Sequence, residues 1–92
     1  PSLLIRHPTG PFPISLLRTG EGSYTACLMS CTHQLCTTIY RESFYLCPCH
    51  GSRFTHAGKV TRGPATRDLT TYPVVVTADE IRILLLDLKT NN

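Results

Sequence analysis

Short apolar and β-branched runs recur along the chain, separated by Gly, Pro, Asp or Ser. Runs of this kind between turn-forming residues are typical of β-strands, and none of them shows the spacing of an amphipathic helix. The pattern therefore predicts an all-β fold made of short strands. The runs cover residues 3–5, 14–17, 24–29, 37–40, 44–46, 72–77 and 81–86.

Two pairs of neighbouring runs predict hairpins. Residues 37–40 and 43–46 flank the dipeptide Arg41-Glu42, so we expect a two-residue turn there. Residues 74–76 and 81–84 flank a short polar segment, which predicts a second hairpin close to the end of the sequence.

The length and charge of the chain suit one small domain. With 92 residues it can bury one modest core, and a domain of this size gains stability from cross-links and cofactors. The net charge of +3 is slight, and no basic run with interleaved aromatic residues predicts nucleic-acid binding. No apolar run approaches the roughly 20 residues that a membrane-spanning helix needs.

Cysteine and histidine are concentrated in two short segments. Residues 31–36 are Cys-Thr-His-Gln-Leu-Cys and residues 47–52 are Cys-Pro-Cys-His-Gly-Ser, so together they hold four of the five cysteines. Each segment can direct one thiolate and one imidazole nitrogen at a common metal centre. A structural zinc site fits the same ligand types, but it leaves Cys36, Cys49 and the pair Gly51-Ser52 without a role.

These two segments resemble the cluster-binding motifs of the Rieske iron-sulfur protein family. In its high-potential branch, from cytochrome bc-type complexes, the motifs are Cys-Thr-His-x-Gly-Cys and Cys-Pro-Cys-His-Gly-Ser. A third loop of that branch carries Gly-Pro, matched here by Gly63 and Pro64. The resemblance covers roughly residues 24–88 and is strongest over residues 31–68.

The resemblance implies a fold as well as a site. It predicts a single domain over residues 1–92, an all-β Rieske-type sheet sandwich with a small inserted cluster-binding subdomain. The inserted subdomain would cover about residues 31–68, and the base sheets would come from residues 1–30 and 69–92.

The resemblance also implies roles for individual side chains. A Rieske 2Fe-2S cluster would be bound by four of them, Cys31 and Cys47 on one iron and His33 and His50 on the other. Cys36 and Cys49 would form a disulfide between the two segments, with free thiols as the alternative. Because two histidines replace two thiolates, such a cluster carries less negative charge and is reduced more easily than a four-cysteine cluster.

Three further positions bear on the properties of the cluster. Ser52 matches a family serine whose hydroxyl donates toward a bridging sulfide, which stabilises the reduced state and raises the potential. Where the high-potential branch usually has a hydrogen-bonding tyrosine, this chain has Phe54, so we predict a potential below that of a typical member. Leu35 replaces a usual glycine, which predicts a different path for the first segment.

The resemblance implies electron transfer, and it favours the iron-sulfur subunit of a quinol-oxidising bc-type complex. An exposed ligand histidine, His50 or His33, would contact quinol and accept its proton while the cluster is reduced, and a cytochrome b- or c-type subunit would be the redox partner. The alternative is a Rieske subunit or ferredoxin-like carrier of another oxidoreductase, such as arsenite oxidase or an oxygenase system. Over these 92 residues we expect no catalytic iron domain, so we expect the chain to be at most one redox subunit of an enzyme.

Basic side chains follow the second segment, and we expect them either to steer an acidic redox partner or to form an ordinary solvated face. These side chains are Arg53, Lys59, Arg62 and Arg67. A disulfide persists best in an oxidising space, which favours the periplasm or the outer face of an energy-transducing membrane. The sequence begins at Pro1 rather than methionine, and we expect membrane attachment only through an N-terminal element absent from it.

The remaining cysteine and the two other histidines lie outside the motifs. Cys27 has no partner among the five cysteines, so we expect it to be a small buried apolar residue. His7 and His56 have no ligand spacing, and we expect both on the surface.

Overall fold

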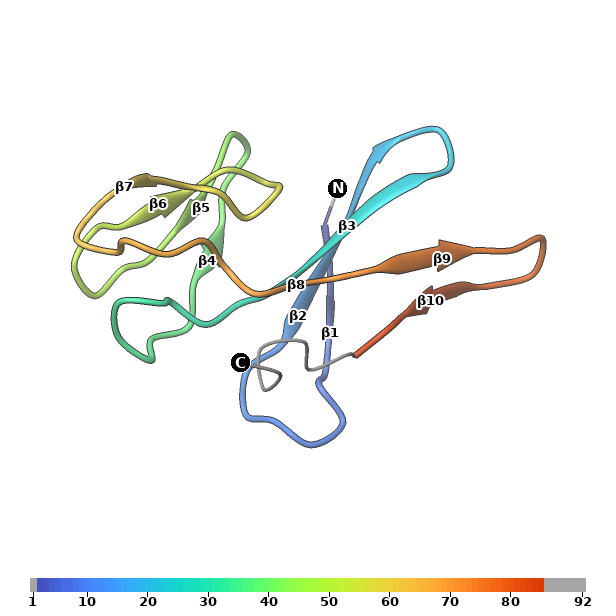
Figure 1. Ribbon diagram of the computed structural model, residues 1–92, viewed down its shortest axis with the longest axis horizontal. Helices are drawn as coiled ribbons and strands as arrows, with labels where there is room; N and C mark the ends of the chain where they lie inside the picture. The colour runs from blue at the N-terminus through green and yellow to red at the C-terminus, as the bar shows by residue number, and fades with distance from the viewer. Residues whose placement is uncertain (1, 86–92) are drawn as a thin grey trace.

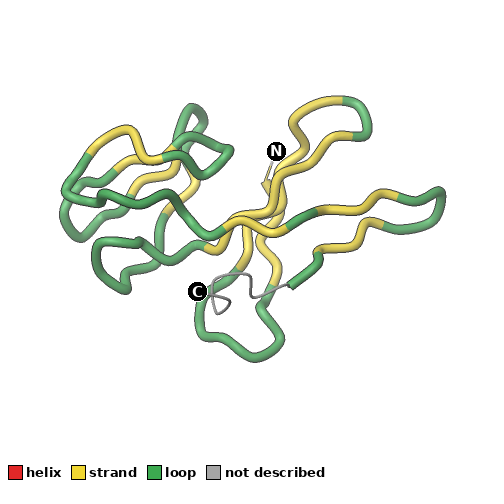
Figure 2. The backbone as a smooth tube through the Cα atoms, viewed as in Figure 1, coloured by secondary structure: helices red, strands yellow, loops and turns green. Residues whose placement is uncertain are grey.

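The computed structural model describes residues 2–85, and all regular structure in this part of the chain is β-structure (Figure 1). The described backbone consists of short strands joined by loops, and no segment of it is helical (Figure 2). The strands form two four-stranded antiparallel sheets and one two-stranded hairpin. The all-β prediction is confirmed. Over residues 2–85 there is accordingly no helix of the length and hydrophobicity that crossing a membrane requires.

The first sheet, called here the base sheet, has the strand order β1-β2-β3-β8. Its strands are β1 (Ser2–Ile5), β2 (Ile14–Gly20), β3 (Ser23–Leu28) and β8 (Thr71–Tyr72). The chain turns between β2 and β3 at Gly22, whose φ of 72° carries no Cβ penalty in glycine. Cys27 on β3 pairs with Thr71 on β8, so the chain leaves the base sheet after β3 and returns beside it.

The hairpin of β9 (Val74–Val76) and β10 (Ile81–Ile83) extends away from the base sheet, at the right of Figure 1. Pro73 separates β9 from β8, since proline has no N–H to donate to a strand ladder. Val74 and Ile83 pack against the buried residues of the base sheet. The second predicted hairpin is confirmed.

The second sheet, called here the site sheet, lies at the left of Figure 1 and has the order β4-β5-β6-β7. Its strands are β4 (Ile39–Tyr40), β5 (Tyr45–Leu46), β6 (Arg53–Phe54) and β7 (Val60–Arg62). Tyr45 pairs with Tyr40 on one side and with Phe54 on the other. These pairings fix the two ends of the cysteine-rich loop between β5 and β6.

A buried core joins the two sheets. It combines Cys27 of the base sheet with Tyr45 and Phe54 of the site sheet, and all three side chains are fully buried. The Tyr45 hydroxyl oxygen lies 2.7 Å from Oγ of Ser15 on β2, a hydrogen bond across the junction. A second cluster of buried side chains, Ile14, Leu16 and Ala26, belongs to the base sheet.

The boundaries of some strands differ from the predicted runs. The two-residue turn predicted at Arg41-Glu42 was wrong, because β4 and β5 enclose residues 41–44, closed by a 2.8 Å hydrogen bond from the Arg41 amide to the Phe44 carbonyl. The strands β6 and β7 were not predicted. The last part of the predicted run 81–86 and of the predicted base segment 69–92 lies outside the described residues.

Candidate iron-sulfur site

Three loops meet beside the site sheet, at the left of Figure 1. The first loop, residues 31–36, lies between β3 and β4, and the second loop, residues 47–52, connects β5 to β6. The third loop, residues 63–69, runs from β7 toward β8 and begins with a cis peptide bond between Gly63 and Pro64. All residues predicted to bind or tune a cluster lie on these loops, except Phe54 on β6.

Cys31 and Cys47 begin the first and second loops, and each side chain is 1% exposed. Burial raises the pKa of the Cys31 thiol, but hydrogen bonds to the thiol lower it by more, so the pKa is lowered overall. The hydrogen bonds come from the backbone amide of Gln34, the Cys47 thiol, the His33 amide and the Ser52 hydroxyl. Burial and the neighbouring Cys31 raise the pKa of Cys47, while the amides following Cys47 act in the opposite direction. The backbone amides of the two loops are therefore already directed at the two sulfur atoms.

The second loop owes its shape to local hydrogen bonds. The Gly51 amide donates to the Cys47 carbonyl at 2.9 Å, and the Cys47 amide donates to the Ser52 carbonyl at 2.8 Å. Gly51 has a φ of 85°, a conformation that glycine adopts readily and that L-residues with a Cβ rarely adopt. This tight turn places the Cys47 sulfur inside the protein and leaves His50 exposed at the surface.

His33 and His50 lie side by side at the surface. Both residues are exposed, and their ring centroids are 5.2 Å apart with an interplanar angle of 89°. They come from different loops, 17 positions apart in the sequence, so the fold brings together the two imidazoles that the motifs predict. The two predicted thiols are thus buried, whereas the two predicted imidazoles are exposed.

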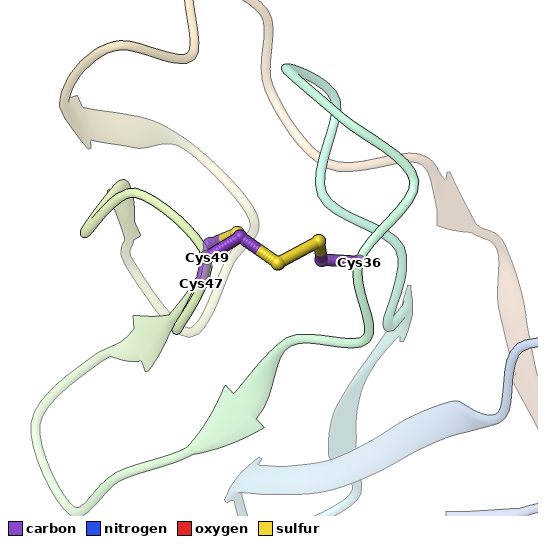
Figure 3. Close-up of side chains that lie close together, drawn as sticks. All are labelled: Cys36, Cys47 and Cys49. Carbon is purple, nitrogen blue, oxygen red and sulfur yellow. A yellow bond between two sulfur atoms is a disulfide. The ribbon is translucent and has the colours of Figure 1, made fainter.

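A disulfide connects Cys36 of the first loop to Cys49 of the second loop (Figure 3). The two Cα atoms are 6.5 Å apart, within the normal range for such a bond. The Cys47 sulfur lies within 4.8 Å of both disulfide sulfurs. Because the disulfide occupies Cys36 and Cys49, these three sulfurs cannot form a thiolate site for one ion, which leaves Cys31 and Cys47 as the available thiols of the loops.

Ser52 connects the second loop to the third. Its side chain is fully buried, and its Oγ accepts a 2.9 Å hydrogen bond from the Ala65 amide. A hydroxyl that accepts one bond still has its own proton to donate, and Cys31 is the sulfur toward which it acts. The third loop is therefore held close to the predicted cluster ligands.

The two departures from the family motifs have different structural consequences. Phe54 is fully buried in the core that includes Cys31 and Cys47, so its ring packs beside the site. Leu35 is 81% exposed at the end of the first loop. Within residues 2–85 no residue other than glycine has a positive φ, so the first loop follows a path that leucine accepts.

Thr32 and Arg67 make a reciprocal contact that the sequence did not predict. Thr32 Oγ1 donates to the Arg67 carbonyl at 2.6 Å, and Arg67 Nη2 donates to the Thr32 carbonyl at 3.2 Å. This contact connects the first loop to the third. From the sequence, Arg67 is only one of several basic side chains that follow the second segment.

The residues outside the motifs behave in part as predicted. Cys27 is fully buried, and burial raises the pKa of its thiol to about 11. His56 is half-buried rather than fully exposed, because its ring stacks on Tyr40 with centroids 5.0 Å apart. His56 Nε2 also lies 2.8 Å from the Arg41 carbonyl. His7 is half-buried as well, and its Nδ1 accepts the Gly10 amide at 2.8 Å.

Comparison with known proteins identifies the family. The model of the Rieske [2Fe-2S] domain matches residues 6–73, which include all three loops. The chain belongs to the Rieske [2Fe-2S] domain family. Its cofactor is a Rieske 2Fe-2S cluster.

Individual Rieske proteins resemble the chain to different extents. It is 35% identical to the cyanobacterial plasma membrane Rieske protein PetC3 from Synechocystis PCC 6803, with a TM-score of 0.78 over 89% of this chain and 84% of that one. It is 43% identical over 54 residues to the cytochrome b6-f complex iron-sulfur subunit of Synechococcus sp. (strain JA-2-3B'a(2-13)), covering 56% of this chain and 31% of that protein.

A relative from a different type of complex is also matched over only part of its length. The ubiquinol-cytochrome c reductase iron-sulfur subunit of Rhodobacter capsulatus is 38% identical over 71 residues, 73% of this chain and 37% of that protein. The Rieske chain described here therefore spans well under half the length of these curated relatives. The shared part contains the fold and the loops of the site, which are the features that the family assignment rests on.

Proposed function

We propose that this Rieske domain belongs to the iron-sulfur subunit of a quinol-oxidising bc-type complex. In this proposal Cys31 and Cys47 bind one iron of the cluster, and His33 and His50 bind the other. The observation that carries it is the arrangement of the donors: two buried, hydrogen-bonded thiols and two exposed imidazoles 5.2 Å apart. The donor types match a Rieske cluster, in which histidines replace two cysteines on one iron only.

The exposed imidazoles explain how a proton can move with an electron. When bound, the cluster supplies a one-electron redox couple. Each imidazole that binds a metal through one ring nitrogen has a second nitrogen free to carry or accept a proton. His33 and His50 are both exposed, so they can present that nitrogen to a quinol hydroxyl and accept its proton. Cys31 and Cys47 are shielded from solvent and from the partner.

The proposed partners follow from the relatives and from charge. The curated relatives are subunits of cytochrome b6-f and ubiquinol-cytochrome c reductase complexes, which supports a cytochrome b- or c-type subunit as redox partner. Basic side chains on β6, β7 and the third loop support an acidic docking surface on that partner. We place the domain at the periplasm or the outer face of an energy-transducing membrane, since the disulfide favours an oxidising space.

The division of the chain is part of the same proposal. Residues 1–30 and 69–92 would form the base, and residues 31–68 the cluster-binding subdomain. The site sheet and its loops support this division over the described residues, since β4 to β7 pair only with one another there.

A potentiometric titration followed by EPR at several pH values tests the proposed function. We expect a rhombic signal of the reduced protein with low average g, at a positive potential that falls with rising pH. The control is Cys31→Ser, which removes one proposed ligand and is expected to abolish the signal while the base sheet folds. A zinc-loaded protein without any signal would overturn the ligand assignment.

One observation favours a second candidate, a carrier or subunit for a different oxidoreductase. Phe54 provides no hydroxyl beside the site, which lowers the expected potential. The same titration separates the two candidates. A signal at a negative and nearly pH-independent potential would support the carrier, whereas a positive and pH-dependent potential supports the quinol-oxidising complex.

A further inference from the structure

The three loops of the site are joined pairwise by three different contacts. A disulfide joins the first loop to the second, and the hydrogen bond from the Ala65 amide to Ser52 joins the second loop to the third. The reciprocal hydrogen bonds of Thr32 and Arg67 join the third loop to the first. Each loop is therefore held to both of the others.

The third loop is a fixed support at the point where this contact forms. Two positions before Arg67, the Ala65 amide is bound to the buried Ser52 hydroxyl. One position after Arg67, Asp68 Oδ1 accepts the Val60 amide at 2.9 Å. Two positions after Arg67, the Leu69 amide donates to the Gly58 carbonyl at 2.7 Å. The Arg67 carbonyl is thus held between anchored neighbours.

The first loop has fewer external supports. Its hydrogen bonds from Cys31 to Cys36 and from Cys36 to Gln34 lie within the loop. His33 is exposed, and so is Leu35. A cavity of about 590 Å³ opens along the loop, with Thr32, Leu35 and Arg67 among its lining residues. Packing therefore does not fill the space behind the loop, and its position depends on its two ends.

We infer that Arg67 is a positioning residue of the iron-sulfur site: with Thr32 it clamps the first loop to the third and so fixes the direction in which His33 presents its imidazole. The disulfide holds the far end of the loop at Cys36, three positions beyond His33. The clamp acts at Thr32, directly before His33. The inference rests on the proposed function to the extent that His33 is a ligand.

The two hydrogen bonds of the clamp can be removed separately, because each joins a side chain to a backbone carbonyl. Arg67→Gln removes the guanidinium and leaves the bond from the Thr32 hydroxyl. Thr32→Val removes the hydroxyl and leaves the bond from Arg67. Thr32→Ser keeps a hydroxyl at this position and therefore keeps both bonds. Arg62→Gln, which removes an exposed arginine at the end of β7, is the matched control for charge.

The experiment measures amide hydrogen exchange across residues 31–36 and the EPR spectrum of the same cluster-loaded proteins. We expect Arg67→Gln and Thr32→Val each to speed exchange in this segment by about fivefold and to shift the g values, with Thr32→Ser and Arg62→Gln like wild type. If both bonds form one clamp, the double variant Arg67→Gln, Thr32→Val accelerates amide exchange by less than the product of the factors measured for the two single variants.

Unchanged exchange and unchanged g values in both Arg67→Gln and Thr32→Val would overturn the inference. A double variant whose exchange is accelerated by the full product of the two single-variant factors would overturn it as well. Loss of the cluster from these two variants, with retention in Arg62→Gln, is a result that the clamp also predicts. A wild-type protein with no Rieske signal would instead overturn the proposed function. In that case the exchange rates alone still decide whether the clamp orders the first loop.

Discussion

Ser52 Oγ accepts the Ala65 amide at 2.9 Å, and the same hydroxyl hydrogen-bonds to the Cys31 thiol and lowers its pKa. One buried hydroxyl therefore joins the second and third loops and also donates to a predicted ligand. A hydrogen bond to a sulfur that gains negative charge stabilises the reduced state more than the oxidised state. Ser52 thus contributes both to the closure of the site and to its redox potential.

We predict that Ser52→Ala lowers the potential. A loss of about 1.4 kcal/mol in the preference for the reduced state corresponds to about 59 mV for one electron. The measurement is a potentiometric titration at one pH. Ser30→Ala, which removes another buried hydroxyl close to the first loop, serves as the control. Equal potentials for Ser52→Ala and wild type would exclude the tuning role.

A second prediction concerns Phe54. Its ring is fully buried in the core beside Cys31 and Cys47, so a hydroxyl added there must find an acceptor inside the protein. Phe54→Tyr is expected to raise the potential, by roughly the amount that Ser52→Ala lowers it. The control is Phe44→Tyr, whose ring is half-buried beneath the Arg53 guanidinium at 4.4 Å. A potential that stays the same or falls would contradict the prediction.

The sequence predicted the parts of the site that depend on motif chemistry. Cys31, His33, Cys47 and His50 stand at ligand spacings, and the structure brings the two histidine rings together. The pairing of Cys36 with Cys49 followed from the family resemblance and is present in the structure. The spacing of the cysteines alone left the pairing open, since any two of five can combine.

Other features depended on contacts that no local pattern encodes. The clamp joins Thr32 and Arg67 across 35 positions and uses backbone carbonyls as acceptors, so neither side chain indicates its partner. The strand β6 has two residues, one of them arginine, and exists because β5 pairs with it. The half-buried position of His56 likewise results from stacking on Tyr40, a residue of β4 that lies 16 positions earlier in the chain.

Removal of the disulfide gives a third prediction. The bond closes a loop with a sequence separation of 13, for which the chain-entropy estimate is about 3 kcal/mol of stability. We expect the Cys36→Ala and Cys49→Ala double variant to lose about this amount in urea unfolding and to release the cluster faster. Unchanged unfolding and unchanged cluster retention would mean that hydrogen bonds alone hold the first two loops together.

The last prediction concerns alkaline pH. Burial raises the pKa of Cys27 from 9.0 to about 11, and burial raises the pKa of Tyr45 from 10.0 to about 12 against the opposing hydrogen bond with Ser15. Below pH 9 both groups are protonated whether the chain is folded or unfolded. Above it the unfolded chain loses protons that the folded chain keeps, so the free energy of unfolding falls as pH rises, by up to about 1.4 kcal/mol per pH unit for each group.

Urea unfolding between pH 8 and 12 measures this fall in the free energy of unfolding. Variants show which of the two groups causes it in each pH range. Tyr45→Phe removes the hydroxyl at the junction of the two sheets and should flatten the decline between pH 10 and 12, while costing about 1 kcal/mol at neutral pH for the lost hydrogen bond. Cys27→Ala should flatten it between pH 9 and 11. Tyr24→Phe on β3, a half-buried tyrosine outside this core, is the control. A decline of the same steepness in Tyr45→Phe and in wild type would mean that the buried hydroxyl does not keep its proton in the folded protein.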